Sequence, residues 1–203
     1  MPGHGGGTGL FEADPTQDGV SCSAVTTMDG TRQMATVRLD GATGLRIGGQ
    51  AREALAGARD LACIALSAEQ VGADRRALDM TVDYTKVRVQ FGRAVGGFQA
   101  LQHRMADLHV LVESARSLSY AAAQAAGERA PDTGLRAAAA KVYCSEALQR
   151  VSAETIQLHG AIGITWEHDA HRYLKRAHGA AQLFGRPSEH VARIAAGVID
   201  RRP

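Results

Sequence analysis

The feature that most constrains the fold is a helical pattern of apolar residues from Ala51 to about Lys86. About 36 helical residues would span roughly 54 Å at 1.5 Å per residue. A helix of this length is far longer than the globular average, so it is expected to pack along other long helices in a large bundle. The residues that carry the pattern lie three, four or seven positions apart, with one skipped turn: Leu61, Ile64, Ala68, Val71, Leu78, Val82 and Thr85.

Two more long helices are predicted, from Phe98 to about Gly127 and from about Thr133 to Gly160. The segment Ala130-Pro131-Asp132-Thr133 supplies the turn between them and an N-cap. Their apolar positions are Phe98, Leu101, Met105, Leu108, Val112 and Ala115 in the first, and Leu135, Ala138, Val142, Leu148, Val151, Thr155 and Leu158 in the second, with polar Ser145 at one position where an apolar residue is expected.

A shorter helix is predicted from about Trp166 to Leu183, and Gly185-Arg186-Pro187 separates it from a last helix that begins at Ser188. The last helix contributes Val191, Ile194 and Val198 to the expected core. Long helices joined by brief connections predict a mainly α fold, an antiparallel bundle of the four-helix type.

The first 49 residues have a different composition. Glycine is frequent, and the β-type runs GLFEA, VSCSAV and MATVRLD are separated by turn residues, which predicts two or three strands. So small a sheet cannot bury a core of its own. It must lie on the helical part or be what remains of a larger β domain. The expected domains are therefore a β remnant at 1–49 and a helical bundle at 50–203.

Composition excludes several classes of partner. A formal net charge of +2 is too small to indicate nucleic acid or an acidic membrane surface. The first residues lack the apolar core of a signal peptide, and no apolar run is long enough to cross a bilayer. Cys22, Cys63 and Cys144 show no CxxC spacing, so reduced thiols and a cytoplasmic location are expected.

Two stretches suggest binding. The helix that ends at Gln157-Leu158-His159 breaks at Gly160-Ala161-Ile162-Gly163, and glycine there allows positive φ and close approach of another group. Such a corner suits a pyrophosphate, but the stretch alone equally fits an ordinary helix C-cap, which is the commoner case. His168, His171 and His178 could face one metal ion, but no carboxylate follows at a zinc spacing. A hydrated helix face accounts for them better, and no metal site is expected.

Four segments together resemble the C-terminal helical domain of the acyl-CoA dehydrogenase family, and their order and spacing match it. They are Glu69-Gln70-Val71-Gly72, Tyr84 with Arg88-Val89-Gln90-Phe91-Gly92, Phe98-Gln99-Ala100, and Gln157-Leu158-His159-Gly160. The strands at the start look like the tail of the family's middle β domain. Phe184-Gly185 and the run from Thr165 to Arg176 look most like members that work as unlike subunit pairs on sterol-derived acyl-CoAs.

The resemblance implies FAD as cofactor. In the family a carboxylate removes the α proton of an acyl thioester, and the flavin takes the β hydrogen as hydride. Arg88 and Gln90 match positions that reach the adenosine and phosphate part of a neighbouring subunit's FAD, although Arg88 could also be a plain helix-end charge. Asp60 matches an acidic substrate-binding position. The other implied FAD contacts are Phe91, Phe98, Gln99, Gln157, Gly160 and Ala161.

The departures from the family concern the catalytic base. Gly185 stands where the family usually keeps its catalytic Glu, and Ala62 stands at the alternative position, followed by Cys63 in place of an Arg. The second Gly of the phosphate turn is Ala161. Glu189, one helical turn beyond Gly185, is the first substitute to consider; Glu69 and Glu167 fit surface carboxylates better. The chain also corresponds to only about half of the family's length, without its N-terminal helical domain and the first half of its β domain.

Two functions remain open. The first is an oxidoreductase subunit in a homo- or hetero-oligomer that shares in FAD and acyl-CoA binding, with the base supplied by a partner subunit. Alone, such a chain is expected to hold flavin weakly and to be inactive. The second is a non-catalytic, bundle-forming scaffold or a truncated remnant. The retained Arg88, Gln90, Gln99 and Gln157 favour the first, whereas Gly185 and Ala62 favour the second.

Overall fold

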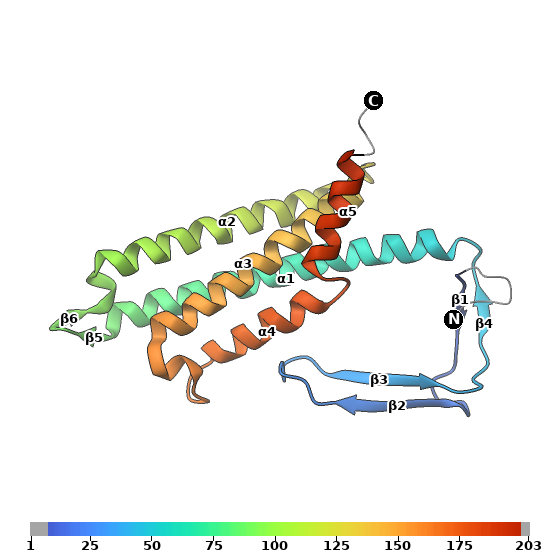
Figure 1. Cartoon of the computed structure of the whole chain (residues 1–203), viewed down its shortest axis with the longest axis horizontal. Coiled ribbons are helices and arrows are strands. Elements are labelled where there is room, and N and C mark those ends of the chain that lie inside the picture. The colour runs from blue at the N-terminus through green and yellow to red at the C-terminus, as the bar shows by residue number, and fades with distance from the viewer. Residues whose placement is uncertain (1–7, 200–203) are drawn as a thin grey trace. The chain divides into compact units, whose positions relative to one another are not determined.

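A computed structural model describes residues 8–199 of the chain (Figure 1). It divides into two compact units, residues 1–59 and residues 60–203. The described part is mainly helical. Its helices are α1 (Ala51–Val87), α2 (Gln99–Gly127), α3 (Thr133–His159), α4 (Ala170–Gln182) and α5 (Pro187–Ile199), with short 3₁₀ helices η1 (Val95–Gly97) and η2 (Gly160–Ile164).

The first unit contains two antiparallel ribbons. β1 (Leu10–Glu12) pairs with β4 (Leu45–Ile47), and β2 (Val20–Val25) pairs with β3 (Met34–Leu39). Strand β4 was not predicted, although Leu-Arg-Ile between two glycines carries the alternation of a short strand. Apolar side chains of these ribbons, among them Val37 and Leu45, remain exposed. This agrees with the expectation that so small a sheet buries no core of its own.

The second unit is built around α3. Its close neighbours are α2, α4 and α5, and Figure 1 shows α1, α2 and α3 running lengthwise beside one another. Buried alanines on α3 allow this close approach, because small side chains let helix backbones come near each other. The buried alanines of α3 are Ala137, Ala138, Ala140 and Ala147. The predicted antiparallel helical bundle is confirmed.

The apolar patterns of α2 and α3 are confirmed at their centres, where Leu108, Val112, Leu148 and Val151 are buried. The pattern of the last helix is wrong in part, since Val191 and Val198 are exposed on α5. These two side chains therefore do not belong to the core of the unit.

The predicted buried stripe of α1 is partly wrong. Leu61 is 60% exposed and Ala68 is also exposed. The buried face combines apolar and polar side chains, and several of the polar ones bond to other helices. Ser67 Oγ lies 2.9 Å from Ser119 Oγ, Gln70 Nε2 donates to Ser145 Oγ over 3.1 Å, and Thr81 Oγ1 donates to Thr155 Oγ1 over 3.0 Å. Apolar periodicity does not predict the burial of these polar residues, because their hydrogen-bond partners lie on other helices.

The predicted start of the fourth helix is wrong. The helix begins at Ala170, whereas residues 166–169 form turns. Local hydrogen bonds replace helical ones here: Thr165 Oγ1 donates to Ile162 O over 2.9 Å, and the Ala170 N–H donates to His168 Nδ1 over 3.2 Å. Such side-chain bonds offer the backbone an alternative to the helix.

A second feature missed from the sequence is a short hairpin after α1. β5 (Val89–Gln90) pairs with β6 (Arg93–Ala94). The two residues between them, Phe91 and Gly92, both have positive φ, 54° and 78°. That combination is the type I′ turn, whose twist matches the strands that it joins.

The side chains of Lys141 and Asp74, both ionisable, lie buried inside the bundle. Lys141 is 0% exposed, and its Nζ donates to Ser145 Oγ and to the carbonyls of Ala180 and Ala181. Asp74 is equally buried, and neither of its carboxylate oxygens has a hydrogen-bond partner among the described residues. Burial without compensation raises the pKa of Asp74 to about 8.

The raised pKa of Asp74 predicts a pH-dependent stability. The unfolded chain releases this proton near the ordinary value of 3.8, while the folded chain keeps it up to about pH 8. Between these values the folded state binds one more proton, so the free energy of unfolding falls as pH rises, by at most about 1.4 kcal/mol per pH unit. Asparagine cannot ionise, so Asp74→Asn should lose less stability than the parent chain between about pH 5 and pH 8.

Urea unfolding followed by circular dichroism at several pH values measures this difference. Asp79→Asn is the matched control, because Asp79 lies on the same helix but is partly exposed and pairs with Arg75. It should keep the parent slope. Equal slopes for Asp74→Asn and the parent chain would contradict the prediction.

Candidate functional site

The residues predicted to bind ligands fall in two places in the second unit. One is the end of the bundle where α1 meets the end of α3. Tyr84 Oη donates to His159 O over 3.3 Å, and the two rings stack with 4.4 Å between centroids. His168 extends the cluster, with its ring centroid 4.3 Å from that of His159. Gly160 follows His159, and Arg88 lies one helical turn beyond Tyr84. The contact between Tyr84 and His159 therefore brings the two predicted FAD-binding segments to the same end of the bundle (Figure 1).

The first of these segments is the β5–β6 hairpin. Its backbone is anchored where the Arg88 N–H donates to Tyr84 O over 2.9 Å and the Val95 N–H donates to Arg88 O over 2.8 Å. The side chains of Arg88 and Gln90 are exposed, and Phe91 is 91% exposed. The hairpin thus presents a guanidinium, an amide and an aromatic ring on its surface.

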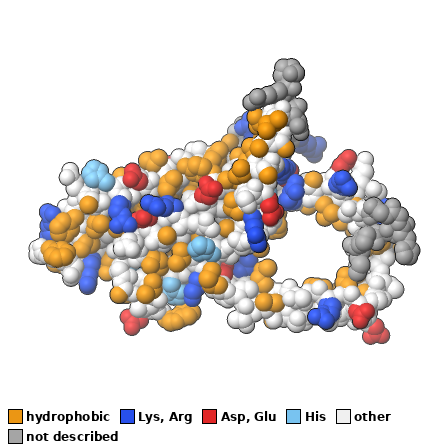
Figure 2. Space-filling model, viewed as in Figure 1, with side chains coloured by type: hydrophobic (Ala, Val, Ile, Leu, Met, Phe, Trp, Pro, Cys, Tyr) orange, Lys and Arg blue, Asp and Glu red, His pale blue; other side chains and the backbone are white. Residues whose placement is uncertain are grey.

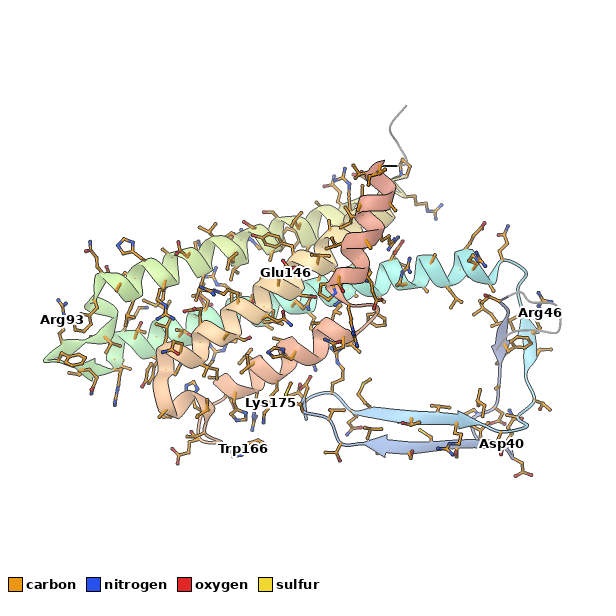
Figure 3. The ribbon with its side chains drawn as sticks, viewed as in Figure 1. Asp40, Arg46, Arg93, Glu146, Trp166 and Lys175 are labelled. Carbon is orange, nitrogen blue, oxygen red and sulfur yellow. The ribbon has the colours of Figure 1, made fainter. Side chains whose placement is uncertain are left out.

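Phe98 and Gln99 lie beside the hairpin. The ring of Phe98 meets that of Phe91 edge to face, with 6.1 Å between centroids, and the Arg93 guanidinium lies 4.0 Å from the Phe98 centroid. Figure 3 labels Arg93 at this end of the bundle. Gln99 is the exposed first residue of α2. In Figure 2, hydrophobic and basic side chains lie together on the surface of this end.

The second segment is the turn after α3. Gly160 has φ 66° and ψ −145°, so the predicted positive φ is confirmed. A Cβ built on Gly160 would meet nothing within 4 Å, so backbone conformation requires the glycine there and crowding does not. Gln157 and Ala161 are exposed on either side. Exposed amides and a guanidinium at one end of a bundle are groups that bind phosphate oxygens.

The second place is the connection between α4 and α5. Gly185 lies there with φ 102°, and a Cβ on it would stand 2.9 Å from His190 Nε2 and 3.3 Å from Glu189 Oε2. Cys63 of α1 lies next to His190, with its Sγ 3.8 Å from His190 Nε2. The two positions at which a catalytic base was expected from the sequence, Gly185 and Ala62, are thus brought to one region.

Asp60, expected to bind substrate, forms a bidentate ion pair with Arg193 in the same region. Arg193 Nη1 and Nη2 donate to its two carboxylate oxygens over 2.7 and 2.9 Å. These hydrogen bonds raise the pKa of Arg193 above its usual value. Gly134 of α3 leaves room for the pair, since a Cβ there would lie 2.6 Å from Arg193 Nη2. A substrate contact by Asp60 remains a prediction.

Sequence reasoning missed His190 and Arg193. Three positions apart on a helix, they lie on one face of α5. The three-residue spacing indicates that the two side chains share a helix face. Nothing in the sequence indicates that this face meets Asp60 and Cys63, which lie more than a hundred positions earlier.

The histidines after α3 do not form the hydrated face that was expected. His171 is buried, with its ring 4.6 Å from that of Trp166, whereas His178 is exposed. Lys175 Nζ lies 4.3 Å from the centroid of Trp166, and Figure 3 labels both residues. Among residues 8–199, no group of three His, Cys, Asp or Glu side chains is arranged to hold a metal ion.

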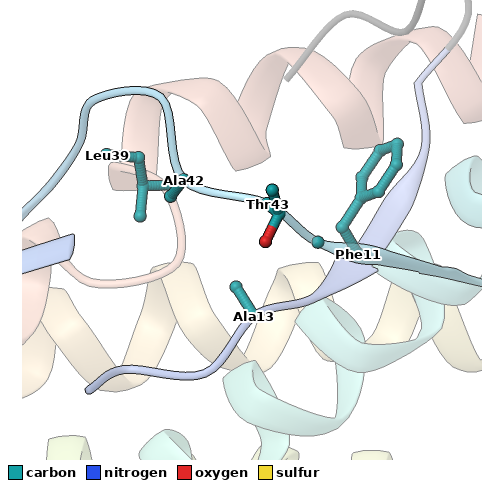
Figure 4. Close-up of a pocket in the computed structure, with 6 residues that line it drawn as sticks. Phe11, Ala13, Leu39, Ala42 and Thr43 are labelled. Atoms are coloured by element: carbon teal, nitrogen blue, oxygen red, sulfur yellow. The ribbon is translucent and has the colours of Figure 1, made fainter. Parts of the chain in front are cut away.

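Three further features of the structure bear on where a ligand could bind. A hollow of about 190 Å³ in the first unit is lined by none of the predicted site residues (Figure 4). No helix within residues 8–199 has the length and apolar character needed to cross a membrane. Cys63 and Cys144 are buried, whereas Cys22 is exposed. The hollow is lined by Phe11, Ala13, Leu39, Ala42, Thr43 and Gly44.

Comparison with known proteins decides the family. Residues 50–199 match the family described as "Acyl-CoA dehydrogenase, C-terminal domain". The chain belongs to the acyl-CoA dehydrogenase family. Among curated relatives, acyl-CoA dehydrogenase IpdE2 of Mycolicibacterium smegmatis is 48% identical over 173 residues, which cover 85% of this chain and 51% of the relative. IpdE2 of Mycobacterium tuberculosis is 48% identical over 177 residues, covering 86% and 51%. The chain therefore spans about half the length of these acyl-CoA dehydrogenases.

Solved structures of the family have the same fold. The "Tcur3481-Tcur3483 steroid ACAD" matches with a TM-score of 0.86 and 32% identity, over 95% of this chain and 52% of that one. The ChsE4-ChsE5 complex from Mycobacterium tuberculosis matches with a TM-score of 0.86 and 28% identity, over 96% and 53%. Each of these two names joins two different proteins, and the fold of this acyl-CoA dehydrogenase chain corresponds to about half of the chain matched in each.

Backbone geometry at Gly185 yields a prediction. An L residue at φ 102° is strained, and its Cβ would crowd the buried ring of His190, so Gly185→Ala should lower the free energy of unfolding by about 1–3 kcal/mol. Gly72→Ala is the matched control. Gly72 lies inside α1 with nothing within 4 Å of a built Cβ, so alanine should stabilise the helix by about 0.5–1 kcal/mol. Chemical unfolding of both variants measures the contrast, and equal stability of the two would refute the strain at Gly185.

Proposed function

We propose that this chain is a subunit of an acyl-CoA dehydrogenase that shares in binding FAD and an acyl-CoA thioester, while a partner subunit supplies the catalytic base. The main support is the contact between the ends of two helices. The Tyr84–His159 contact joins the end of α1 to the end of α3, so that Arg88 and the Gln157–Ala161 turn lie at one end of the bundle. These are the segments that match the family's FAD contacts.

The residues present suit the phosphate and adenosine part of FAD. Arg88 supplies fixed, permanently charged donors, Gln90 and Gln157 supply amides, and the turn at Gly160 supplies backbone N–H groups. Phe91, Phe98 and Gln99 would line the cofactor beside them. When bound, FAD accepts the β hydrogen of the acyl chain as hydride. The strong exposure of the hairpin supports contact with a cofactor held largely by a neighbouring subunit.

The base is assigned to a partner because neither family position carries a proton acceptor. Gly185 has no side chain, and Ala62 cannot take a proton. The space that a side chain at Gly185 would enter is taken by the buried His190. Glu189 places a carboxylate near that space, with Oε2 3.3 Å from the built Cβ, and it is the substitute to test in this chain.

We infer a hetero-oligomer and a bulky, sterol-derived acyl group from the relatives. Of the two solved relatives, one is named a steroid ACAD, and both are named as pairs of different proteins. Exposed apolar side chains at the hairpin end, including Val87, Val89 and Phe91, suit burial in a subunit contact. A cytoplasmic location is proposed on the grounds of the reduced thiols expected from the sequence.

A dye-reduction assay on a panel of acyl-CoA thioesters tests the proposed function. The chain alone should give no turnover, since general-base help is worth about 10²–10⁴-fold. Co-expression with a relative that retains the catalytic Glu should produce activity and a complex larger than 21.4 kDa. Robust turnover by the chain alone, abolished in Glu189→Gln, would assign the base to this chain. Inactivity with every such partner would favour the scaffold function.

Removing Arg88 tests the cofactor assignment. In the complex, Arg88→Ala should weaken FAD retention by roughly 10- to 100-fold, as expected for loss of charge-assisted hydrogen bonds worth about 1.5–3 kcal/mol. Flavin absorbance after dialysis measures the loss. Arg136→Ala is the matched control, because Arg136 is a partly exposed arginine on α3 that pairs with Asp132. Equal flavin retention in both variants would mean that Arg88 is merely a helix-end charge.

A further inference from the structure

The last turn of α4 is bonded to a lysine buried in the bundle. Lys141 Nζ donates to Ala180 O over 3.1 Å and to Ala181 O over 3.2 Å, and its third bond goes to Ser145 Oγ over 3.1 Å. The last carbonyls of a helix lack partners of the helical kind and carry partial negative charge. A buried ammonium therefore satisfies this helix end, and the carbonyls in turn compensate the charge of Lys141.

Beyond this anchor the backbone takes an unusual path. Leu183 is extended, with ψ 141°, and the next two residues, Phe184 and Gly185, have φ 57° and 102°. A left-handed conformation is unfavourable for phenylalanine and persists only where the surroundings enforce it. On the far side of the turn, His190 Nε2 lies 3.0 Å from Phe184 O. The segment 183–186 is thus held between Lys141 and His190.

The anchor also extends to α1. Ser145 Oγ accepts a hydrogen bond from Gln70 Nε2 over 3.1 Å as well as from Lys141. Gln70, Ser145 and Lys141 therefore form a buried chain of hydrogen bonds from α1 through α3 to the end of α4. All three side chains are completely buried.

We propose that Lys141 is a positioning residue for the turn 183–186, acting through the Ala180 and Ala181 carbonyls, and that it thereby sets the shape of the acyl-binding region beside Gly185. The second half of this statement rests on the proposed function, whereas the first rests on the hydrogen bonds alone. In this role Lys141 takes no proton from substrate. It lies inside the bundle, and each of its three N–H groups donates a hydrogen bond to a protein oxygen.

Amide hydrogen exchange in the full chain tests the first half. Lys141→Met keeps the length of the side chain but removes the ammonium, so the amides of residues 183–186 should exchange at least about tenfold faster, while those of 108–115 in α2 stay unchanged. Ser145→Ala is the matched control. It removes one bond of Lys141 but leaves both carbonyl contacts, and exchange at 183–186 should stay within about twofold of the parent chain.

Two results would overturn the positioning role. One is unchanged exchange at 183–186 in Lys141→Met; the other is equal acceleration at 183–186 and in α2, which would mean that Lys141 only stabilises the core. Should Lys141→Met fail to fold, Lys141→Gln takes its place, because it removes the ammonium and shortens the side chain, and it should likewise accelerate exchange at 183–186. Failure of both variants to fold would likewise reject a role confined to the turn.

Calorimetric titration with octanoyl-CoA and with a CoA thioester of a steroid side-chain acid tests the second half, in the complex with a partner subunit. Lys141→Met should bind the steroid thioester about fivefold more weakly, and Ser145→Ala should bind it as the parent complex does. Faster exchange with unchanged affinity for both thioesters would retain Lys141 as the anchor of the turn. That combination would contradict the placement of the acyl-binding region beside Gly185, so the two halves of the proposal fail separately.

Discussion

The helical unit depends on polar contacts between its long helices. Where α1 faces the bundle, hydrogen bonds lie among buried apolar side chains such as Ile64 and Leu78: Gln70 bonds to Ser145, and Thr81 bonds to Thr155. A buried polar group must find a partner or destabilise the fold, so each such pair allows only one alignment of the two helices. The close approach of the helices is left to alanine, which adds little side-chain bulk.

This alignment positions both candidate regions. At one end it brings Tyr84 against His159, and with them the hairpin after α1 and the turn after α3. Farther along, Lys141 secures the end of α4, and Asp60 secures α5 through Arg193. Residues that carry no chemistry of their own in the proposed function therefore determine where Arg88, Gln157 and Gly185 lie.

The region around Gly185 links the fold to the division of labour proposed for the subunits. Its backbone has a conformation that suits glycine, and the neighbouring His190 fills the space that a side chain would need. A carboxylate cannot be introduced there without moving buried groups. The packing at this position is thus adapted to glycine, which agrees with the proposal that a partner subunit carries the base.

The sequence by itself determined the lengths and order of the long helices, the break at Gly160 and the family, because periodicity, glycine and motif spacing are local signals. It misjudged the inward face of α1, the start of α4 and the burial of His171. Only the tertiary structure decided which polar residues are buried and which meet: Gln70 with Ser145, Asp60 with Arg193, Lys141 with the end of α4. These partners lie between 39 and 133 positions apart, and a polar side chain shows no sign in its own sequence neighbourhood that a distant partner will compensate its burial.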